Sequence, residues 1–254
     1  MLGKLLKYDL KGILKFLSIF YVITLFFSGL THFFINIESP YIVFLIGRIL
    51  SGTLISFFIS TLINQLMALW IKLFATGVYK DKSYLTHTLP IRKADIYLSK
   101  LLTSIIVSAI SVTVIVVTAF IAYYSEERWK LVKQFLTGEI GKTITILVIF
   151  LFLELINLIQ CGYTGIILGH KCNSGKTGLS VLFSFLAYTV SQIIVLLFTA
   201  AAALISVDFK ALFVSRQVQI PNSVLLTIAA VYLVIIIVNA IINIKLLEKG
   251  VDIE

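Results

Sequence analysis

Six long apolar runs constrain this chain more than any other feature. They lie at about 16–36, 42–76, 98–124, 143–168, 177–206 and 223–245. The hydrocarbon core of a bilayer is roughly 30 Å thick, so a helix needs about 20 apolar residues to cross it. Only 13% of the 254 residues are charged, which leaves too few to coat a water-soluble domain. We therefore predict an all-α polytopic membrane protein, with residues 1–254 forming one transmembrane domain of six helices.

Two of the predicted helices carry additional information. The run at 42–76 would reach roughly 50 Å as a helix, so it either projects beyond the membrane or contains a break. Before the first run, residues 1–15 place leucines and Ile13 on one face and four lysines on the other. This pattern predicts an amphipathic helix at the membrane surface, with ammonium groups near lipid phosphates. The alternative is that these lysines are only the positive flank of the first span.

The distribution of Lys and Arg predicts the orientation. With a cytoplasmic N-terminus, 14 of these residues face the cytoplasm and seven face outward. The inner set is Lys4, Lys7, Lys11, Lys15, Lys72, Lys80, Lys82, Arg92, Lys93, Lys100, Lys171, Lys176, Lys245 and Lys249. Because short cytoplasmic loops are enriched in basic residues, we predict that both termini are cytoplasmic. The same distribution explains the net charge of +9 without nucleic-acid binding.

Two outer segments have the pattern of short helices at the membrane interface. In 125–142, Ser125 is suited to cap a helix, two glutamates follow in its first turn, and Gly138 is suited to end it. In 207–220, Asp208 precedes an apolar face. Neither segment is long enough for a folded external domain.

The sequence disfavours an enzyme. Residues 169–177 resemble a phosphate-binding P-loop, but Gly169 and Gly175 have five residues between them where the motif has four. His32, His87 and His170 lie in separate segments, and no ligand pair has zinc spacing. One carboxylate, Glu154, lies deep in a span, and a single acid cannot form an acid–base pair. We predict no metal site, no catalytic residue and no cofactor bound by this chain.

Polar residues inside the spans form a second group of candidates. Glu154 shares a helix face with Asn157, and an acid at membrane depth costs about 2.5 kcal/mol or more unless it faces the bundle interior or water. The group could line a pathway, with Glu154 as a proton site, or it could join helices through hydrogen bonds. Small residues at four-residue spacing, including Gly165, Gly169, Ser180 and Ser184, favour close helix packing. The candidate polar residues are Asn64, Gln65, Glu154, Asn157, Gln192, Asn239 and Asn243.

The longest cytoplasmic connection, 77–97, contains a distinctive segment. Ser83 is suited to cap a short helix, and Pro90 ends it because the residue before a proline avoids helical geometry. Tyr84, Leu85 and Leu89 would then form an exposed apolar face. Such a face on a short exposed helix suggests docking on a partner protein.

This layout resembles the permease subunits of ABC-2 type transporters, especially the short bacterial ones. The resemblance rests on the basic N-terminal helix, the six spans, the segment Tyr84-Leu-x-x-x-Leu-Pro90 and the closing Leu-Leu-Glu-Lys-Gly-Val-Asp-Ile-Glu tail. It is strongest to permeases of phenol-soluble-modulin and antimicrobial-peptide exporters. It implies a bacterial plasma membrane, two copies of a partner ATPase that binds ATP and Mg, and a second permease subunit, identical or different. It also implies an ATPase-coupling helix formed by Ser83, Tyr84, Leu85, Thr86, His87, Thr88, Leu89 and Pro90.

The resulting hypothesis is the membrane subunit of an ATP-driven exporter. Its expected cargo is amphipathic or hydrophobic, most simply a peptide, because the spans carry almost no fixed charge for a charged solute. The first alternative is an ion-coupled secondary transporter that uses Glu154, which leaves the docking segment unexplained. The second is a membrane-embedded enzyme, which lacks a catalytic cluster.

Overall fold

The chain consists of long helices. The computed structural model describes residues 2–35, 41–79, 92–137, 139–172, 174–205 and 222–249, and within these ranges the regular structure is entirely helical. Six of the helices are long and apolar enough to cross a membrane: Leu2–Ile35, Leu45–Val78, Lys93–Tyr123, Gly141–Gly169, Lys176–Ala202 and Asn222–Glu248. Each of the six apolar runs identified in the sequence coincides with one of these helices. The fold is therefore that of an all-α polytopic membrane protein, as predicted.

The second span is one long helix with an irregular section. It begins as α2 (Tyr41–Met67), continues as a π-helix, η1 (Ala68–Ala75), and ends in α3 (Thr76–Val78). The wider turn is visible where Thr76 donates both its amide and its hydroxyl to the carbonyl of Ile71, five residues earlier. Short π-helical insertions are uncommon and often mark functional positions. The predicted break in this span is thus a widened turn, and the helix axis continues beyond it.

The contacts divide the chain into two compact units. The first comprises Met1–Thr76 and Leu98–Gln134, and the second comprises Gly77–Tyr97 and Phe135–Glu254. The helix α5 (Lys93–Tyr123) begins in the second unit and continues in the first. The segment that the sequence singles out between the second and third spans is therefore flanked on both sides by residues of the second unit.

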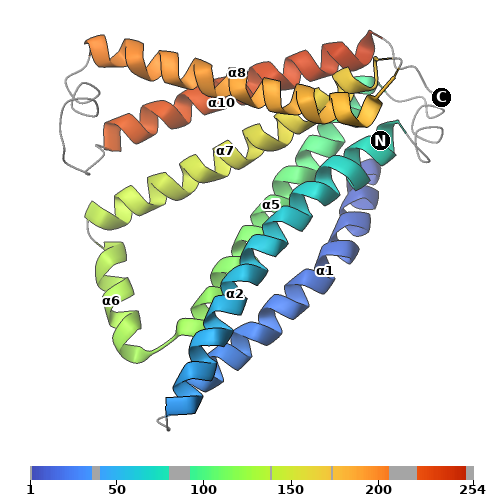
Figure 1. Ribbon diagram of the computed structural model, residues 1–254. Helices are drawn as coiled ribbons and strands as arrows, with labels where there is room; N and C mark the ends of the chain where they lie inside the picture. The colour runs from blue at the N-terminus through green and yellow to red at the C-terminus, as the bar shows by residue number, and fades with distance from the viewer. Residues whose placement is uncertain are drawn as a thin grey trace. The chain divides into compact units, whose positions relative to one another are not determined.

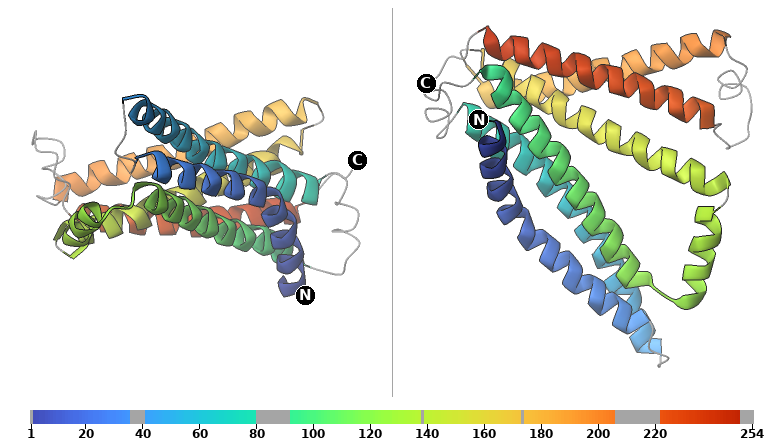
Figure 2. Two further views of the ribbon diagram at one scale, coloured as in Figure 1. Left: turned by 90° about the horizontal axis from the view of Figure 1, so that it is seen from below. Right: turned by 180° about the vertical axis from the view of Figure 1, so that it is seen from behind.

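In the first unit, α1 (Leu2–Ile35), α2 and α5 run side by side (Figures 1 and 2). The Ser28 hydroxyl donates to the Thr118 carbonyl at 2.5 Å, and Tyr21 pairs with Ser111, so α1 and α5 run in the same direction. The Gln65 amide donates to Ser108 at 2.7 Å, and the hydroxyls of Ser51 and Tyr123 are paired, so α2 runs antiparallel to α5. Alternating directions of this kind are what successive crossings of a bilayer require.

The N-terminal basic stretch forms the first turns of α1, and no residue interrupts the helix between it and the first span. Figure 2 shows these turns bending away from the axis of the rest of α1. The Lys72 ammonium of η1 lies over the Phe16 ring, 4.6 Å from its centroid. Residues at the junction of the basic stretch and the first span are thereby tied to the π-helical section of the second span.

The second unit consists mainly of α7 (Glu139–Gly169), α8 (Lys176–Ile205) and α10 (Asn222–Glu248). Thr143 donates to Asn222 near the start of α7, and Thr164 donates to Asn243 near its end, both at 2.8 Å. The helices α7 and α10 therefore run in the same direction. The helix α8 lies between them in the sequence and runs in the opposite direction. Figure 1 shows α8 crossing α10 while α7 approaches α8 toward the turn that joins the two.

Close packing of α7 on α8 depends on glycine. A Cβ atom added at Gly169 would lie 2.6 Å from the Ser180 amide nitrogen and 2.7 Å from its Cα. At Gly165 it would lie 2.5 Å from the Ser180 carbonyl oxygen. Real Cβ atoms do not approach backbone atoms this closely, so any other residue must separate the helices. The predicted packing of small residues at these positions is confirmed.

The described residues include parts of the connections between the long helices. The predicted outer helix is present as α6 (Glu126–Thr137), and the Ser125 hydroxyl accepts from the Arg128 amide at 3.2 Å, as a capping residue should. Between α7 and α8, Gly175 has φ +66°, a left-handed conformation that favours glycine. The residues before Gly169 are helical, whereas a P-loop follows a strand. The segment 207–220 lies outside the described residues.

Candidate functional site: a polar seam in the second unit

Polar side chains from four helices meet inside the second unit. We call this group the polar seam, and it joins α7, α8, α10 and the first turns of α5. Its members are Tyr97, Glu154, Asn157, Gln160, Cys161, Thr164, Tyr188, Ser191, Gln192, Tyr232, Asn239 and Asn243. Asn157, Gln160 and Asn243 have no exposed surface. Polar groups this deep in apolar surroundings are stable only when they are hydrogen-bonded.

Asn157 is at the centre of the contacts between the three helices. Its amide donates to the Ser191 hydroxyl of α8 at 3.0 Å, and its carbonyl oxygen accepts from the Asn239 amide of α10 at 3.2 Å. The Cys161 thiol lies 3.7 Å from the same oxygen. One side chain therefore holds both neighbouring helices against α7, which is the role that amides take between membrane helices.

A second set of bonds extends the seam to the start of α5. The Tyr97 hydroxyl accepts from the amides of Asn243 at 3.0 Å and Gln160 at 3.4 Å. Asn243 in turn accepts from Thr164 at 2.8 Å. Tyr97 is fully buried and lies five residues after Arg92, where the described chain resumes following the predicted coupling segment. The seam is thus connected through a few bonds to one flank of that segment.

Glu154 is the only carboxylate of the seam. The Tyr188 hydroxyl donates to it at 3.2 Å, and the Tyr232 hydroxyl donates to Gln192 at 3.0 Å close by. The side chain of Glu154 is half-buried. This end of the seam therefore combines one acid, two phenols and an amide, a set of groups able to pass a proton or to bind polar backbone groups.

Two amides of the seam retain unused hydrogen-bonding capacity. Among the described residues, the Gln160 carbonyl oxygen and the Gln192 amide nitrogen are buried without a hydrogen-bond partner. An unsatisfied buried polar group costs about 1–3 kcal/mol. The other amides of the seam are used in joining helices, so these two atoms and Glu154 are the positions from which a bound molecule could gain hydrogen bonds.

The structure brings together five of the seven polar residues that the sequence singles out. Glu154, Asn157, Gln192, Asn239 and Asn243 all belong to the seam.

The other two, Asn64 and Gln65, lie in the first unit. Asn64 bonds within its own helix, to the Ser60 carbonyl at 2.8 Å. Gln65 is buried, donates to Ser108, and has a carbonyl oxygen without a partner in the described part of the chain. The second span also carries small and polar residues four apart, at Gly52, Ser56, Ser60, Asn64 and Ala68. Gly52 and Ser56 are exposed, Ser60 and Asn64 are half-buried, and Ala68 is buried.

The flanks of the predicted coupling segment are described, but its residues are not. Positions 83–90 lie outside the described residues. On the side that precedes them, Tyr79 stacks on His170 with ring centroids 4.2 Å apart. On the side that follows, Arg92 and Asp95 form an exposed ion pair at 3.8 Å in the first turn of α5. Burial raises the pKa of the Tyr79 hydroxyl well above its ordinary value.

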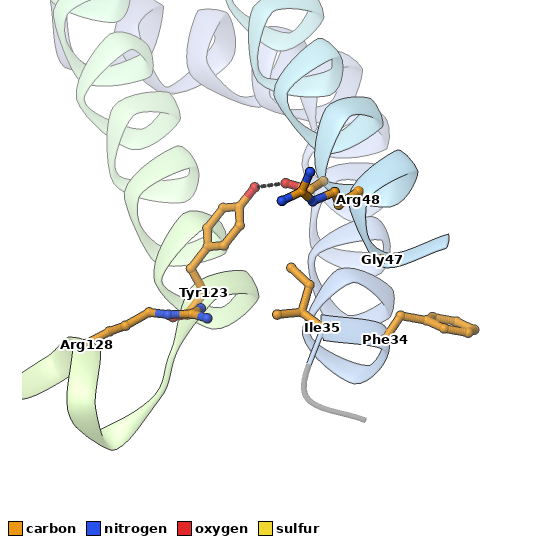
Figure 3. A pocket seen from close by; sticks show the side chains of 7 residues that line it. Phe34, Ile35, Gly47, Arg48, Tyr123 and Arg128 are labelled. Carbon is orange, nitrogen blue, oxygen red and sulfur yellow. Dashed lines mark hydrogen bonds between the residues drawn. The ribbon is translucent and has the colours of Figure 1, made fainter. Parts of the chain in front are cut away.

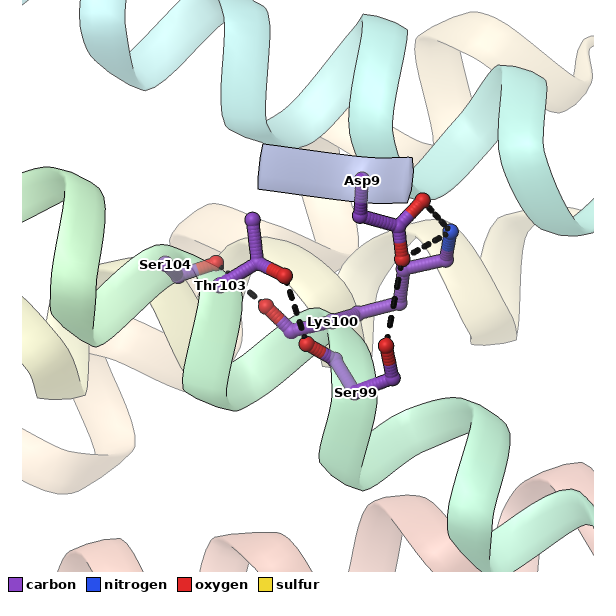
Figure 4. A network of polar contacts seen from close by, with 5 residues as sticks. All are labelled: Asp9, Ser99, Lys100, Thr103 and Ser104. Carbon is purple, nitrogen blue, oxygen red and sulfur yellow. Dashed lines mark hydrogen bonds and ion pairs between the residues drawn. The ribbon is translucent and has the colours of Figure 1, made fainter. Parts of the chain in front are cut away.

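Sequence reasoning missed a buried ion pair in the first unit. The Lys100 ammonium donates to both carboxylate oxygens of Asp9, at 2.7 and 2.8 Å, and the Ser99 hydroxyl donates to one of them at 3.2 Å (Figure 4). The side chains of Lys100 and Asp9 are 5% and 9% exposed. The available signal was that Asp9 is the only acid before Glu38, in a stretch rich in lysine. The pair joins the basic turns of α1 to the start of the third span.

Other chemistry is sparse in the described residues. No three His, Cys, Asp or Glu side chains lie together there as metal ligands would. The thiols of Cys161 and Cys172 are both free. Comparisons of the chain with protein-family models, with curated proteins and with solved structures find no match.

Proposed function

We propose that this chain is the membrane-spanning permease subunit of an ATP-driven ABC exporter. In this assembly it pairs with a second permease subunit in the bacterial plasma membrane, with both termini cytoplasmic, and two copies of a separate ATPase supply the energy. The membrane fold and the basic first turns of α1 are in keeping with this assignment. The cargo is an amphipathic or hydrophobic molecule, most simply a peptide.

The observation that carries the proposal is the segment Tyr84-Leu-x-x-x-Leu-Pro90 together with the way its flanks are held. Tyr79 precedes it and packs on His170, and Tyr97 follows it and bonds to Gln160 and Asn243. A docking element between these two flanks is coupled to the polar seam through the bonds of Tyr97 and to the end of α7 through the ring contact of Tyr79. Movement imposed by a partner at the segment would therefore reach α7 and α10.

The polar seam supports the choice of cargo. Its groups are amides, hydroxyls and one carboxylate, and the surrounding helix surfaces are apolar. Such a lining offers hydrogen bonds to peptide backbone groups but no array of charges to replace the hydration of an ion. The unpartnered atoms of Gln160 and Gln192 are the positions where backbone groups of a cargo would bind.

The decisive experiment is a truncation of the docking face. The chain is co-expressed with a candidate ABC ATPase, whose gene we expect to lie beside its own, and is purified through a tag on the permease. In the variant Tyr84→Ala/Leu85→Ala we expect normal membrane insertion, loss of most co-purified ATPase and loss of cargo-stimulated ATP hydrolysis. The physical reason is that buried apolar anchors carry most of an interface's affinity, about 2 kcal/mol or more each at a hot spot.

The matched control removes similar side chains elsewhere. Trp129 and Val132 are 41% and 43% exposed on α6, on the opposite predicted side of the membrane. The variant Trp129→Ala/Val132→Ala should retain the ATPase. Wild-type yield and stimulation in the Tyr84/Leu85 variant would refute the proposal. Labelling of a C-terminal tag from outside intact cells would refute the orientation.

A second candidate function is supported by the surroundings of Glu154. An ion-coupled secondary transporter needs a titratable group in the membrane, and Glu154 is bonded to Tyr188 beside Gln192 and Tyr232. Transport by the purified chain in vesicles, driven by a proton gradient without any ATPase, would favour this candidate over the first.

A further inference from the structure

Polar side chains of three helices meet in the interior of the first unit, and neither candidate function uses them. We call this group the hydroxyl junction, and its members are Thr24 of α1, Thr61 and Gln65 of α2, and Ser108 of α5. The hydroxyl oxygens of Thr24 and Thr61 lie 3.3 Å apart. Thr24, Gln65 and Ser108 have no exposed surface, and Thr61 is 1% exposed. The junction is therefore closed to the surroundings of the unit.

The hydroxyl hydrogens of both threonines are used within their own helices. Thr24 donates to the Phe20 carbonyl at 2.7 Å, and Thr61 donates to the Phe57 carbonyl at 2.8 Å. A hydroxyl group has one hydrogen and two acceptor lone pairs. The 3.3 Å contact between the two oxygens therefore has no hydrogen left to share, and the oxygens face each other as acceptors.

Gln65 adds a third acceptor. Its amide nitrogen donates to Ser108 at 2.7 Å, and its carbonyl oxygen is buried without a hydrogen-bond partner in the described part of the chain. Thr61 and Gln65 lie one turn apart on the buried side of α2. Buried polar atoms without a partner are rare in native proteins, and each one indicates a ligand, a water molecule or strain.

Other hydroxyls of this unit do not show this shortage of donors. Tyr21 pairs with Ser111 one turn from the junction, at 2.5 Å. Near the ends of α2 and α5, Tyr123 pairs with Ser51, and the dashed line in Figure 3 marks this bond. In each of these pairs a hydrogen atom is available to one of the two oxygens. The hydroxyl junction instead collects acceptors, so the ligand that suits it is a cation or a hydrogen-bond donor.

The depth and the charge of the junction restrict the ligand further. Thr61 lies near the middle of the continuous helix that runs from Tyr41 to Val78. None of the four members of the junction carries a charge. A divalent cation is usually bound by carboxylates, which these residues do not supply. Neutral oxygen atoms can replace the hydration shell of a monovalent cation, as the carbonyl rings of potassium channels do.

The spacing of the threonine oxygens suits a small ion. Oxygen ligands lie about 2.3–2.6 Å from Ca²⁺, and Na⁺ has nearly the same radius. Two such ligands at a right angle around the ion are about 3.3–3.7 Å apart. The observed separation is 3.3 Å. The larger K⁺ ion requires a wider separation.

We propose that the hydroxyl junction binds a sodium ion through the oxygen atoms of Thr24, Thr61 and Gln65. The bound ion joins α1 to α2 at a contact that has no hydrogen atom of its own, so sodium stabilises the first unit. The site is independent of the transport proposal, since it involves neither segment 83–90 nor the polar seam.

The test measures the sodium dependence of the thermal stability of the purified chain in detergent. Sodium chloride, potassium chloride and choline chloride are added separately at equal ionic strength. A ligand that binds only the folded state raises the melting temperature. At about ten times the dissociation constant for sodium, we expect a melting temperature about 3–6 °C above the values in the other two salts. Thr61→Val removes one oxygen atom and should remove this difference.

Two controls leave the junction intact. Thr113 is exposed on α5 and donates to the Ala109 carbonyl of its own helix at 2.8 Å, as Thr61 does to Phe57. Thr113→Val should therefore retain the full sodium effect. Glu154→Gln should also retain it, because Glu154 lies in the second unit.

Further variants test the same oxygen atoms if Thr61→Val does not fold. Thr24→Ser keeps the hydroxyl oxygen and should keep the sodium effect, whereas Thr24→Val should lose it. Gln65→Glu places a carboxylate at the third position. It should shift the sodium titration to lower concentration, because a negative charge binds the cation more tightly.

Four results would overturn the proposal. Equal melting temperatures in the three salts would assign the Gln65 oxygen to a water molecule. An equal effect of potassium and sodium would contradict the selection by size. A sodium effect that survives in Thr61→Val and Thr24→Val would place the ion elsewhere in the chain. Loss of the effect in Glu154→Gln would place it at the polar seam.

Discussion

Removing one partner of the Asp9–Lys100 ion pair should destabilise the first unit strongly. In Asp9→Asn, the Lys100 ammonium loses both of its short bonds to the carboxylate while 95% of its side chain remains buried, since only 5% is exposed. Removing one partner of a buried ion pair costs about 3–5 kcal/mol. Because about 1.4 kcal/mol corresponds to a factor of ten, the unfolding equilibrium should shift by roughly two to four orders of magnitude.

The assay is unfolding of the purified chain in mixed micelles by increasing fractions of SDS, followed by tryptophan fluorescence. Trp129 lies in the first unit, in van der Waals range of Phe120, and reports on that unit. The double variant Asp9→Asn/Lys100→Met removes both charges and keeps most of the buried volume. We expect it to be more stable than Asp9→Asn, because no charge is left without its partner.

The exposed ion pair of Arg92 and Asp95 provides the control. Its atoms are 3.8 Å apart and the Arg92 side chain is 89% exposed. Exposed pairs of this spacing contribute about 0.5 kcal/mol or less, so Asp95→Asn should have little effect. The reasoning from burial would be wrong if Asp9→Asn were no more destabilising than Asp95→Asn. It would also be wrong if the loss of stability in Asp9→Asn/Lys100→Met equalled the sum of the losses in Asp9→Asn and in Lys100→Met.

Three further predictions test other parts of the structure. Gly169→Ala should lower the stability of the α7–α8 packing by about 1–3 kcal/mol through overpacking, whereas Gly178→Ala, whose Cβ meets open space, should be neutral or stabilising in the same SDS titration. Tyr79→Phe should not destabilise the chain at pH 7, because the Tyr79 hydroxyl has no hydrogen-bond partner in the described ranges. Burial raises the pKa of Tyr79 in the folded state, so above about pH 10 the hydroxyl ionises more readily in the unfolded state, and wild type loses stability there. The variant has no hydroxyl to ionise and should lose less stability than wild type in that window. Glu154→Gln should leave ATP-driven export largely intact if the acid only joins helices through Tyr188, and should abolish transport driven by a proton gradient if the chain is a secondary transporter, as flux into vesicles would show.

Much of the secondary structure follows from local sequence patterns. Apolar runs of about 20 residues or more can satisfy their backbone groups in a bilayer only as helices, which is why six of them could be counted directly. The cap of α6 is similarly local, since Ser125 bonds to an amide three residues later. The glycine and serine pairs between α7 and α8 were predictable because close helix packing selects small residues at four-residue spacing.

The partners of polar side chains were decided by tertiary structure. Asn157 and Asn239 lie 82 residues apart in the sequence, and nothing in either neighbourhood indicates that they bond to each other. Asn64 is flanked in the sequence by apolar residues, as Asn157 is. It nevertheless bonds within its own helix, because the opposite side of α2 is the buried one. The side of a uniformly apolar helix that faces the bundle cannot be determined from hydropathy alone.

The sequence by itself determined that this chain is a membrane protein with six apolar runs long enough to cross a bilayer, because the amount and spacing of apolar residues permit no soluble fold. Only the tertiary structure decided which polar groups meet, because that depends on the rotation of each helix and on the register between helices. Asp9 illustrates the difference, since its sequence neighbours are lysines at helical spacing, yet its partner is Lys100, 91 residues later.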